Sequence, residues 1–330
     1  MKQKQWVVIA TVMGVCASFN GILLAQGAGY THEELAPLVN SLIAEGLPAS
    51  LVRKALYDPR IQRVDRAVSY NVMNPDGPRI YQQFVEPFAI RLANRYRRRN
   101  LTALERIEQT YGVSKDVIVA ILLVETQFGN AALRYRPLEV FLSLVVDASP
   151  AGVDRHFARM KAEIPGLERS FIAQRLEKKG DWAYGELVAL LSMWHQRRVK
   201  DIYAVKGSFA GAFGMPQFLP SSYLSWGADG NGDKRIDLNN PSDAMASIAN
   251  FLRFHGWRPD GANAQNMRAV WEYNHSSHYV KAIMGIAARL RWINRPRSEG
   301  PKAIEPMDLV TFGVEPISEQ AANTPSAFFP

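Results

Sequence analysis

The stretch "VIVAILLVETQFGN", residues 117–130, places one carboxylate, Glu125, in an otherwise apolar run. On a helix, Ile121 lies one turn before Glu125 and Phe128 nearly one turn after it, with Leu122 on the same side. The spacing predicts a buried helix, and burial in such surroundings raises the pKa of a carboxyl group. Two interpretations stay open: a structural acid, paired with a buried arginine or pointing outward, and a general acid that stays protonated near neutral pH.

The chain around this helix has a helical pattern almost throughout. Its 330 residues, 47% hydrophobic and 21% charged, have the composition of a globular protein. The segments 31–46, 81–99 and 242–256 repeat apolar residues at three- and four-residue spacing, and the first begins with Thr31, a good N-cap. Alternating strand patterns are scarce, so we expect a mainly α fold with at most a short β ribbon.

The first 28 residues have the layout of a secretory signal. Two lysines precede an apolar run that ends in small residues, and we expect cleavage between Ala25 and Ala28. The run is also long enough to span a bilayer, so an uncleaved membrane anchor is the alternative. Val15 precedes the only cysteine, Cys16, where a lipoprotein signal requires a small residue, so lipidation is not expected. We therefore expect an exported, periplasmic protein whose mature chain has no disulfide and no thiolate site.

The chain is basic, with a net charge of +8 and a pI near 9.5, which favours a polyanionic partner. Arg95, Arg97, Arg98 and Arg99 cluster in "RYRRRN", a pattern that also occurs in nucleic-acid-binding proteins. For an exported protein we interpret the cluster as a solvated, basic helix end, and we expect no nucleic acid partner. A cell-wall polymer that carries carboxylates agrees with both export and charge.

A second stretch, "GSFAGAFGMPQFLPSSY", residues 207–223, combines glycine with amide and aromatic side chains. Gly207, Gly211 and Gly214 permit the backbone to approach other backbone or a ligand closely. Gln217 offers both amide donors and a carbonyl acceptor. The stretch lacks the Lys-Ser/Thr ending of a phosphate-binding loop. A connection that only fills the core is as well supported as a sugar site, in which the apolar faces would come from Phe209, Phe213, Phe218 and Tyr223.

The stretch "DGNGDKRIDLNNPSD", residues 229–243, has oxygen-bearing side chains at alternate positions of an EF-hand-type loop. It departs from that pattern at position six, where Lys234 replaces Gly, and at position twelve, where Asn240 replaces Glu. Asp243 can close the loop instead, or it can be an acid in the first turn of a helix begun by Pro241. A metal-free polar turn is the alternative to a calcium site, for which the predicted ligands are Asp229, Asn231, Asp233, the backbone carbonyl of Arg235, and Asp243.

A fourth stretch, "WEYNHSSHY", residues 271–279, offers Tyr273 for stacking and Asn274 for hydrogen bonding to a sugar. His275 and His278 have the spacing of metal ligands, but no third ligand is near in the sequence. We therefore interpret the two histidines as surface or core residues.

Together these stretches resemble the membrane-bound lytic murein transglycosylase B family. "ETQFG" after the apolar helix, the glycine-rich stretch, the aspartate loop and "ANFLRFHGW" follow one another in the family's order. The likeness covers residues 70–292 and is most specific from Gly207 to Trp257. It implies an α+β, lysozyme-like fold: a helical catalytic core with a small ribbon and an EF-hand-like calcium loop, plus additional helical lobes.

The domain prediction that results has four parts. It places a signal peptide at 1–28, an N-terminal helical region at 29–100, a lysozyme-like catalytic region at 101–295 with a helical insertion at 138–200, and a tail at 296–330. The tail is predicted to be loosely structured because its composition shifts to Pro, Ser, Glu and Ala.

The resemblance also implies the chemistry. Glu125 would be the sole acid and base in a non-hydrolytic cleavage of peptidoglycan between N-acetylmuramic acid and N-acetylglucosamine, leaving 1,6-anhydro ends. Ordinary glycosidases require a second carboxylate, whereas this reaction does not, which explains why none stands out in the sequence. Two alternatives stay open, a muramidase that uses water and a wall-binding protein without activity. The expected partners are glycan strands and proteins of cell-wall synthesis or remodelling, and the chain is expected to be a monomer.

The resemblance assigns roles to further residues by position. A structural Ca²⁺ would occupy the aspartate loop, and no organic cofactor is expected. One departure concerns Met215 and Pro216, where members of the family carry an aromatic residue and Gly, so the shape of the groove is expected to differ there. The residues predicted to bind substrate are Ser208, Gln217, Phe218, Tyr223, Tyr273 and Asn274.

Overall fold

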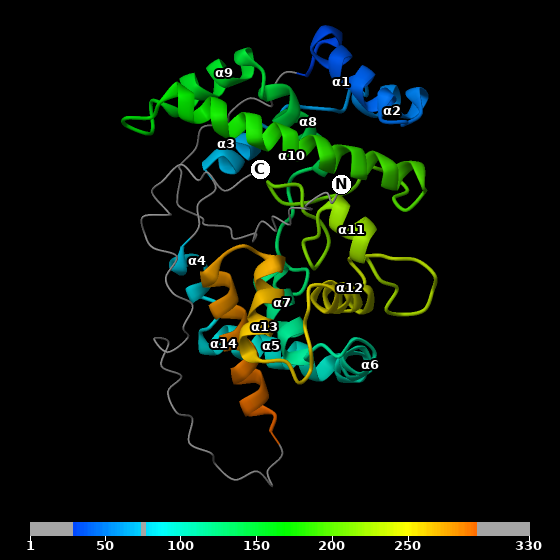
Figure 1. The fold of residues 1–330 in the computed structure, drawn as a ribbon, viewed down its shortest axis with the longest axis vertical. Helices are drawn as coiled ribbons and strands as arrows, with labels where there is room; N and C mark the ends of the chain where they lie inside the picture. The colour runs from blue at the N-terminus through cyan, green and yellow to red at the C-terminus, as the bar shows by residue number, and fades with distance from the viewer. Residues whose placement is uncertain (1–28, 74–76, 296–330) are drawn as a thin grey trace. The chain divides into compact units, whose positions relative to one another are not determined.

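A computed structural model of the chain describes residues 29–73 and 77–295 (Figure 1). The predicted signal peptide and the predicted tail beyond residue 295 lie outside the described residues. The chain divides into two compact units, Met1–Arg291 and Trp292–Pro330. The described residues are mostly helical, which confirms the mainly α prediction.

The helices follow one another along the chain with short connections, apart from the long loops on either side of α11. In chain order the described helices are α1 (His32–Ala44), α2 (Ala49–Leu56), α3 (Asp65–Met73), α4 (Pro78–Gln82), α5 (Pro87–Arg99), α6 (Leu101–Tyr111), α7 (Lys115–Thr126), α8 (Pro137–Asp147), α9 (Pro150–Met160), α10 (Arg169–His195), α11 (Pro220–Trp226), α12 (Pro241–Phe254), α13 (Asn263–Tyr273) and α14 (Ser277–Ile293).

The predicted β ribbon is reduced, within the described residues, to isolated antiparallel bridges. Gly207 pairs with Tyr135 on one side and with Phe213 on the other, and Phe213 pairs with Phe218. All three bridges involve the glycine-rich stretch, so this stretch folds back on itself between α10 and α11.

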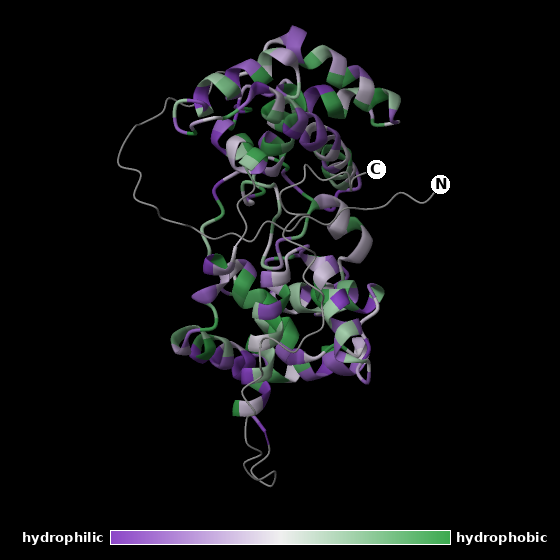
Figure 2. Ribbon diagram, turned by 60° about the vertical axis from the view of Figure 1, so that its left-hand side comes forward, coloured by the Kyte–Doolittle hydropathy of each residue, from purple (hydrophilic) through white to green (hydrophobic). Residues whose placement is uncertain are grey.

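The buried apolar residues form two cores, and neither core is continuous in sequence. One core combines α1, α2 and α3 with α8, α9 and the long helix α10. The other combines α4 to α7 with α11 to α14. Hydrophobic and hydrophilic residues are interspersed along most of the helices (Figure 2), as expected of helices with one buried face. Each core contains segments from both sides of residue 100. The predicted domain boundary at that residue stays a prediction.

The glycine-rich stretch contributes side chains to both cores. Ala212 and Leu219 belong to the core around α10, whereas Phe213, Met215 and Phe218 belong to the core around α7. The stretch therefore lies where the two cores meet.

Local signals explain where several helices begin. Thr31 caps α1 as predicted: its hydroxyl accepts from the Glu34 amide at 3.2 Å, and the Glu34 carboxylate accepts from the Thr31 amide at 2.8 Å. Gly112, at φ 68°, ends α6, and Ser114 occupies the N-cap position of α7 without a side-chain capping bond. Together, Gly112 and Ser114 separate α6 from the helix that carries Glu125.

The basic end of α5 differs in one residue from the solvated helix end predicted for it. Arg97 is buried, and its guanidinium donates to Asp116 on α7 at 2.6 Å. A buried guanidinium needs a carboxylate partner, and Asp116 supplies it. The pair joins α5 to the helix that carries Glu125.

The lengths and hydropathies of the helices can be compared with those of membrane-spanning segments. Between residues 29 and 295, gap excepted, no helix has the length and hydropathy that a bilayer-spanning segment needs.

Candidate active site

Glu125 lies in the last turn of α7 and is fully buried, with 0% of its surface exposed. Apolar residues surround it along the helix, as the sequence predicts: Ile121 and Leu122 are both fully buried. The C-terminal end of a helix carries a partial negative charge, which also disfavours an ionised carboxylate. The position therefore favours the protonated acid on two grounds.

Among the described residues, the only hydrogen-bond partner of the Glu125 carboxyl group comes from a distant helix. The hydroxyl of Tyr279, on α14, donates to Oε1 at 2.7 Å. Burial raises the pKa of Glu125 to about 8, although the hydrogen bond from Tyr279 acts in the opposite direction. At neutral pH the group is thus a carboxylic acid that can give up a proton.

The other oxygen of Glu125 is available. Oε2 is buried and has no hydrogen-bond partner among the described residues, and no ion pair to Glu125 occurs among them. A structural acid would be paired, because an unsatisfied buried polar atom is costly. The contacts therefore favour the general-acid interpretation over the structural one.

The three glycines of the glycine-rich stretch are needed for close approach, which confirms the prediction. A Cβ on Gly207 would lie 2.5 Å from the carbonyl oxygen of Ala212, and one on Gly211 would lie 2.3 Å from the ring of Phe141. A Cβ on Gly214 would lie 2.3 Å from the Cβ of Leu238. All three distances are shorter than real contacts, so any side chain would push the stretch out of place.

The backbone of this stretch is fixed next to Glu125 by three hydrogen bonds. The Met215 amide donates to the carbonyl of Leu238 at 2.9 Å, and the Thr126 hydroxyl donates to the Met215 carbonyl at 2.8 Å. The Tyr273 hydroxyl donates to the carbonyl of Pro216 at 2.6 Å. Thr126 directly follows Glu125, so the stretch is attached to the end of α7.

Left-handed backbone occurs on both sides of this attachment. Gln127 and Phe128 have φ of 48° and 64°, and Gly129 has φ of 84°. In the glycine-rich stretch, Gly214 has φ of 72° and Gln217 has φ of 51°. For residues with a side chain this conformation costs about 1–2 kcal/mol each, and it persists only where neighbouring contacts enforce it.

Two of the residues predicted to bind substrate carry unsatisfied oxygens. Ser208 and Gln217 are buried, and Ser208 Oγ and Gln217 Oε1 have no partner among the described residues. The Gln217 amide nitrogen donates to the carbonyl of Gly214 at 2.9 Å, which leaves its oxygen free to accept. Like Glu125 Oε2, these atoms have hydrogen-bonding capacity that a ligand can satisfy.

The other predicted substrate-binding residues lie in or near the core. Phe218 and Tyr273 are fully buried with ring centroids 6.0 Å apart, and the Tyr223 hydroxyl donates to the carbonyl of Ile236 at 3.0 Å. Asn274 is half-buried at the C-cap of α13. Their contact with a sugar stays a prediction; in this conformation the rings of Phe218 and Tyr273 pack against protein.

The aspartate loop is closed by Asp243 at the start of α12. One oxygen of Asp243 accepts from the Gly230 amide at 2.9 Å, and the other accepts from the Asp237 amide at 2.8 Å. Asp229 accepts from the amides of Gly232 and Lys234 at 2.6 and 2.7 Å. The side chains thus organise the loop through backbone bonds, and each carboxylate oxygen keeps a further lone pair.

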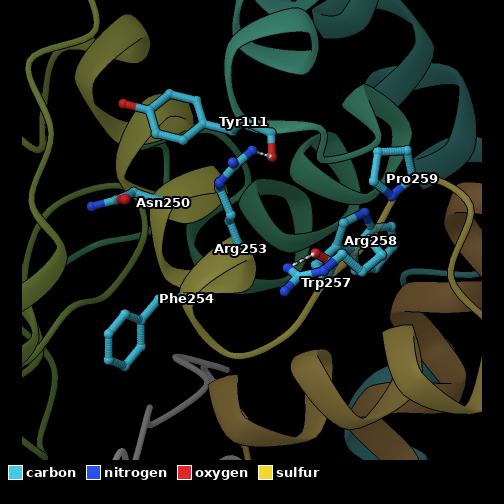
Figure 3. Close-up of a pocket in the computed structure, with 7 residues that line it drawn as sticks. All are labelled: Tyr111, Asn250, Arg253, Phe254, Trp257, Arg258 and Pro259. Atoms are coloured by element: carbon cyan, nitrogen blue, oxygen red, sulfur yellow. Dashed lines mark hydrogen bonds between the residues drawn. The ribbon is translucent and has the colours of Figure 1, made fainter.

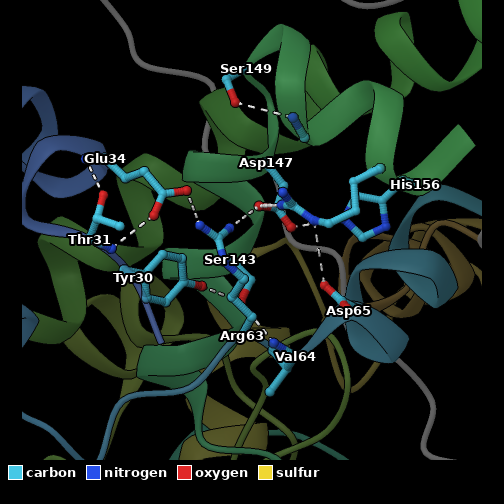
Figure 4. Close-up of polar contacts among 12 residues, drawn as sticks. Tyr30, Thr31, Glu34, Arg63, Val64, Asp65, Ser143, Asp147, Ser149 and His156 are labelled. Carbon is cyan, nitrogen blue, oxygen red and sulfur yellow. Dashed lines mark hydrogen bonds and ion pairs between the residues drawn. The ribbon is translucent and has the colours of Figure 1, made fainter. Parts of the chain in front are cut away.

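A second group of possible metal ligands is an ion-pair network (Figure 4). The side chains of Asp65, Asp147 and His156 approach within 4.8 Å of one another. However, Asp147 accepts from Arg63 at 2.7 Å and from Arg155, and His156 contacts its other oxygen at 2.8 Å. Burial raises the pKa of Asp147, but the bond from His156 and the nearby guanidinium charges outweigh burial and lower it. A cation would have to displace the guanidinium groups, so we interpret the cluster as structural.

A cavity of about 510 Å³ at the ends of α6 and α12 is separate from Glu125 (Figure 3). Arg253 points across it and donates to the carbonyl of Tyr111, the last residue of α6, at 3.0 Å. A guanidinium at a helix C-terminus is a favourable cap. The cavity offers no carboxylate or imidazole for acid–base chemistry, since its lining consists of Tyr111, Asn250, Arg253, Phe254, Trp257, Arg258 and Pro259.

In the described part of the chain, one other buried carboxyl group has a raised pKa. Glu186, on α10, is 4% exposed, and burial raises its pKa to about 7. Its two oxygens accept from the amide of Ser221 at 3.0 Å and from the Ser221 hydroxyl at 2.6 Å. Unlike Glu125, Glu186 has both oxygens bound by protein, so we interpret it as a structural acid at the start of α11.

Residues 31–265 match the family model described as the transglycosylase SLT domain, which covers more than half of the chain. The chain belongs to this family. The membrane-bound lytic murein transglycosylase B of Escherichia coli K12 is 31% identical over 198 residues, which make up 58% of this chain and 47% of that protein. The chain therefore spans about half the length of the curated relative that it matches.

Solved structures share the fold of this SLT chain. The E. coli lytic transglycosylase SLT35 in complex with calcium has a TM-score of 0.62 at 22% identity, covering 81% of this chain and 96% of that one. SltB3 from Pseudomonas aeruginosa in complex with NAG-anhNAM-pentapeptide has a TM-score of 0.62 at 17% identity, covering 80% of each chain. At these identities the likeness shows the fold, which confirms the predicted lysozyme-like architecture.

Two residues of this site, Tyr279 and Thr126, are not predicted from the sequence. Tyr279 lies within the quoted stretch 271–279 but received no role, because nothing local links it to Glu125. Thr126 lies beside Glu125, yet its bond to Met215 depends on packing. The one feature of the sequence that could have indicated Tyr279 is its phenol hydroxyl, in the stretch 271–279 that resembles the family.

Proposed function

We propose that this chain is a lytic transglycosylase that cleaves peptidoglycan between N-acetylmuramic acid and N-acetylglucosamine, with Glu125 as the single acid and base. The observation that supports this best is the fully buried Glu125, with a pKa near 8 and one oxygen left without a protein partner among the described residues. Further support comes from membership of the SLT family and from a structural relative solved with an anhydro-sugar peptide.

The proposed reaction needs one carboxyl group in two protonation states. Protonated Glu125 donates its proton to the glycosidic oxygen as the bond from that oxygen to the anomeric carbon of N-acetylmuramic acid breaks. The resulting carboxylate takes the proton of the C6 hydroxyl of the same sugar, and the C6 oxygen bonds to the anomeric carbon. Glu125 returns to its starting state, the product carries a 1,6-anhydro ring, and no water is consumed.

The contacts of Glu125 suit both steps. Oε2, free of partners among the described residues, is the oxygen that would exchange the proton. The Tyr279 hydroxyl donates to Oε1, and a donated hydrogen bond stabilises the carboxylate formed by the first step. Ser208 Oγ and Gln217 Oε1 would accept hydrogen bonds from the sugar, and Phe218, Tyr223, Tyr273 and Asn274 would shape the groove around it.

The products of the reaction test this function. Purified sacculi treated with the full chain are expected to release muropeptides with 1,6-anhydro ends, which mass spectrometry distinguishes from reducing ends by the mass of one water. Reducing N-acetylmuramic acid ends without anhydro ends would instead identify a hydrolytic muramidase. Binding to sacculi without release of any muropeptide would identify a wall-binding protein and contradict the proposal.

We also propose that the aspartate loop holds a structural Ca²⁺. The donor set is made of hard oxygens, the kind that Ca²⁺ prefers: Asp229, Asn231, Asp233, the carbonyl of Arg235, and Asp243. Lys234 has φ of 66°, the left-handed conformation for which EF-hand loops place Gly at position six. A relative solved in complex with calcium adds support. The ion would bring loop segments together and supply charge there, without taking part in bond cleavage.

Calcium is therefore expected to raise the melting temperature of the chain. At a Ca²⁺ concentration 100 times the Kd the gain is about 2.7 kcal/mol, which corresponds to about 5 °C for a protein of this size. Differential scanning fluorimetry with Ca²⁺, Mg²⁺ or a chelator measures the shift. Asp233→Asn is the matched variant, because its remaining oxygen can still accept from the Arg235 amide, as Asp233 does at 2.8 Å. Equal melting temperatures with Ca²⁺ and chelator, or an undiminished shift in Asp233→Asn, would contradict the site.

The expected location and partners follow from the same function. Peptidoglycan lies outside the inner membrane, so the chain would act in the periplasm after export, and an uncleaved N-terminal run would keep it at the membrane. The basic surface charge would favour wall polymers that carry carboxylates. Partners in wall synthesis or remodelling, and a monomeric state, stay predictions.

A further inference from the structure

Thr126 connects two parts of the candidate site through one hydroxyl group. Its Oγ1 donates to the carbonyl of Met215 at 2.8 Å and accepts from the amide of Gly129 at 3.0 Å. Thr126 is 1% exposed, so both bonds are shielded from water. A hydroxyl is suited to this double contact, because it is one donor and one acceptor at the same atom.

The two connected segments are both held in unfavourable backbone conformations. Gln127 and Phe128, between Thr126 and Gly129, have positive φ, and so does Gln217 in the glycine-rich stretch. Such conformations in residues with side chains relax unless contacts enforce them. The Thr126 hydroxyl contacts the first turn through Gly129 and the second through Met215. Gly129 also lies close to the side chain of Met215, since a Cβ built on Gly129 would lie 3.4 Å from Met215 Cγ.

The consequence concerns the free oxygens around Glu125. Glu125 directly precedes Thr126, whereas Gln217, with its unsatisfied Oε1, lies two residues after Met215. The distance between Glu125 Oε2 and Gln217 Oε1 thus depends on how the end of α7 is attached to the glycine-rich stretch. The Tyr273 hydroxyl fixes the neighbouring Pro216 carbonyl, but this bond links α13 to the glycine-rich stretch and does not involve the turn after Glu125.

We propose that Thr126 is a positioning residue for the cleavage reaction. Its hydroxyl fixes the turn after Glu125 against the glycine-rich stretch, and it thereby sets the position of the acid relative to the oxygens that bind the substrate. This inference rests on the proposed function. Positioning matters to the rate because a displacement of about 1 Å at a reacting group can cost about 100-fold.

The test compares two variants that differ in one group. Thr126→Val keeps the shape but removes both hydrogen bonds, and Thr126→Ser keeps the hydroxyl. We expect Thr126→Val to lower kcat for muropeptide release about 100-fold while KM changes less than about threefold, and Thr126→Ser to stay within about threefold of the parent. Parent-like kcat in Thr126→Val, or an equal loss in Thr126→Ser, would overturn the proposal.

Ser143→Ala controls for a purely structural effect. The Ser143 hydroxyl also joins two segments, since it contacts the Tyr30 hydroxyl at 2.7 Å and accepts from the Val64 amide at 3.1 Å, but these belong to the core around α10 (Figure 4). This control is expected to lower the melting temperature without changing kcat. A loss of kcat in Ser143→Ala as large as that in Thr126→Val would show that any lost connection slows the enzyme, and it would overturn a specific role for Thr126.

A second readout separates this inference from the proposed function. Hydrogen–deuterium exchange of peptides covering 126–131 and 213–219 is expected to speed up in both segments in Thr126→Val and in neither in Thr126→Ser, because only the valine releases the two turns. If the parent released no anhydro-muropeptides, the proposed function would fail on its own. Unchanged exchange in Thr126→Val would overturn the attachment whatever the activity.

Discussion

Replacing Glu125 with glutamine is expected to lower the rate of muropeptide release from sacculi by at least about 10³-fold, because the change removes the only group proposed to donate and accept the proton. Glutamine has nearly the same shape, and its oxygen can accept from the Tyr279 hydroxyl as Glu125 Oε1 does at 2.7 Å. The buried surroundings of position 125 are therefore preserved. The rate is measured as muropeptides released per enzyme under conditions in which the parent is linear with time.

Glu186→Gln is the matched control for this prediction. Glu186 is also a buried carboxyl group with a raised pKa, and a glutamine there can accept from the Ser221 amide and donate to the Ser221 hydroxyl. We expect this variant to keep its activity within about threefold of the parent, since it leaves the proton donor unchanged. A parent-like rate in Glu125→Gln would exclude Glu125 as the acid. Equal losses in the two variants would attribute the effect to the loss of any buried carboxyl group.

The parts of this site that the sequence predicted are those that depend on local pattern. The course of α7 and the burial of Glu125 follow from the apolar residues in the turns before it, whereas Phe128, expected on the same helix, lies beyond its end at Thr126. The close approaches at Gly207, Gly211 and Gly214 follow from residue type, because a stretch so rich in glycine has few other uses in a packed protein.

The contacts that the sequence did not predict join residues far apart along the chain. Tyr279 is 154 residues from Glu125, and Met215 is 89 residues from Thr126. Which hydroxyl reaches which oxygen depends on how α14 and the glycine-rich stretch pack onto α7. Neither propensity nor spacing carries that information, so Tyr279 could be recognised only as a member of a familiar stretch.

Aromatic and basic residues show a related limit of sequence analysis. In a sequence, an aromatic residue that contacts a sugar has the same pattern as one that fills the core. In the structure, Phe218 and Tyr273 pack against protein. In the same way, Arg97 in a run of arginines looks solvated until its partner Asp116 is known. In both cases the residue type fixes what the side chain prefers, and the tertiary fold decides what it meets.

The pH dependence of stability provides a test of Glu125 that needs no substrate. Burial raises the pKa of Glu125 from an ordinary value of 4.5 to about 8 in the folded chain. Between these values the folded state holds a proton that the unfolded state has released, so the free energy of unfolding falls as pH rises, by about 1.4 kcal/mol per pH unit. Above pH 8 both states are ionised and the contribution stays constant. Glutamine does not titrate and shows no such loss.

The stability advantage of Glu125→Gln over the parent is therefore expected to grow by roughly 4 kcal/mol between pH 5 and pH 8. Urea unfolding of both proteins at each pH unit measures it, and titration of Glu186 cancels in the difference because both proteins contain that group. A difference that is constant over this range would mean that Glu125 ionises in the fold as it does in the unfolded chain, and the protonated acid on which the cleavage mechanism depends would then be absent at neutral pH. A difference that grows only above pH 8 would contradict the same assignment, because it would place the loss of the proton outside the window that burial sets.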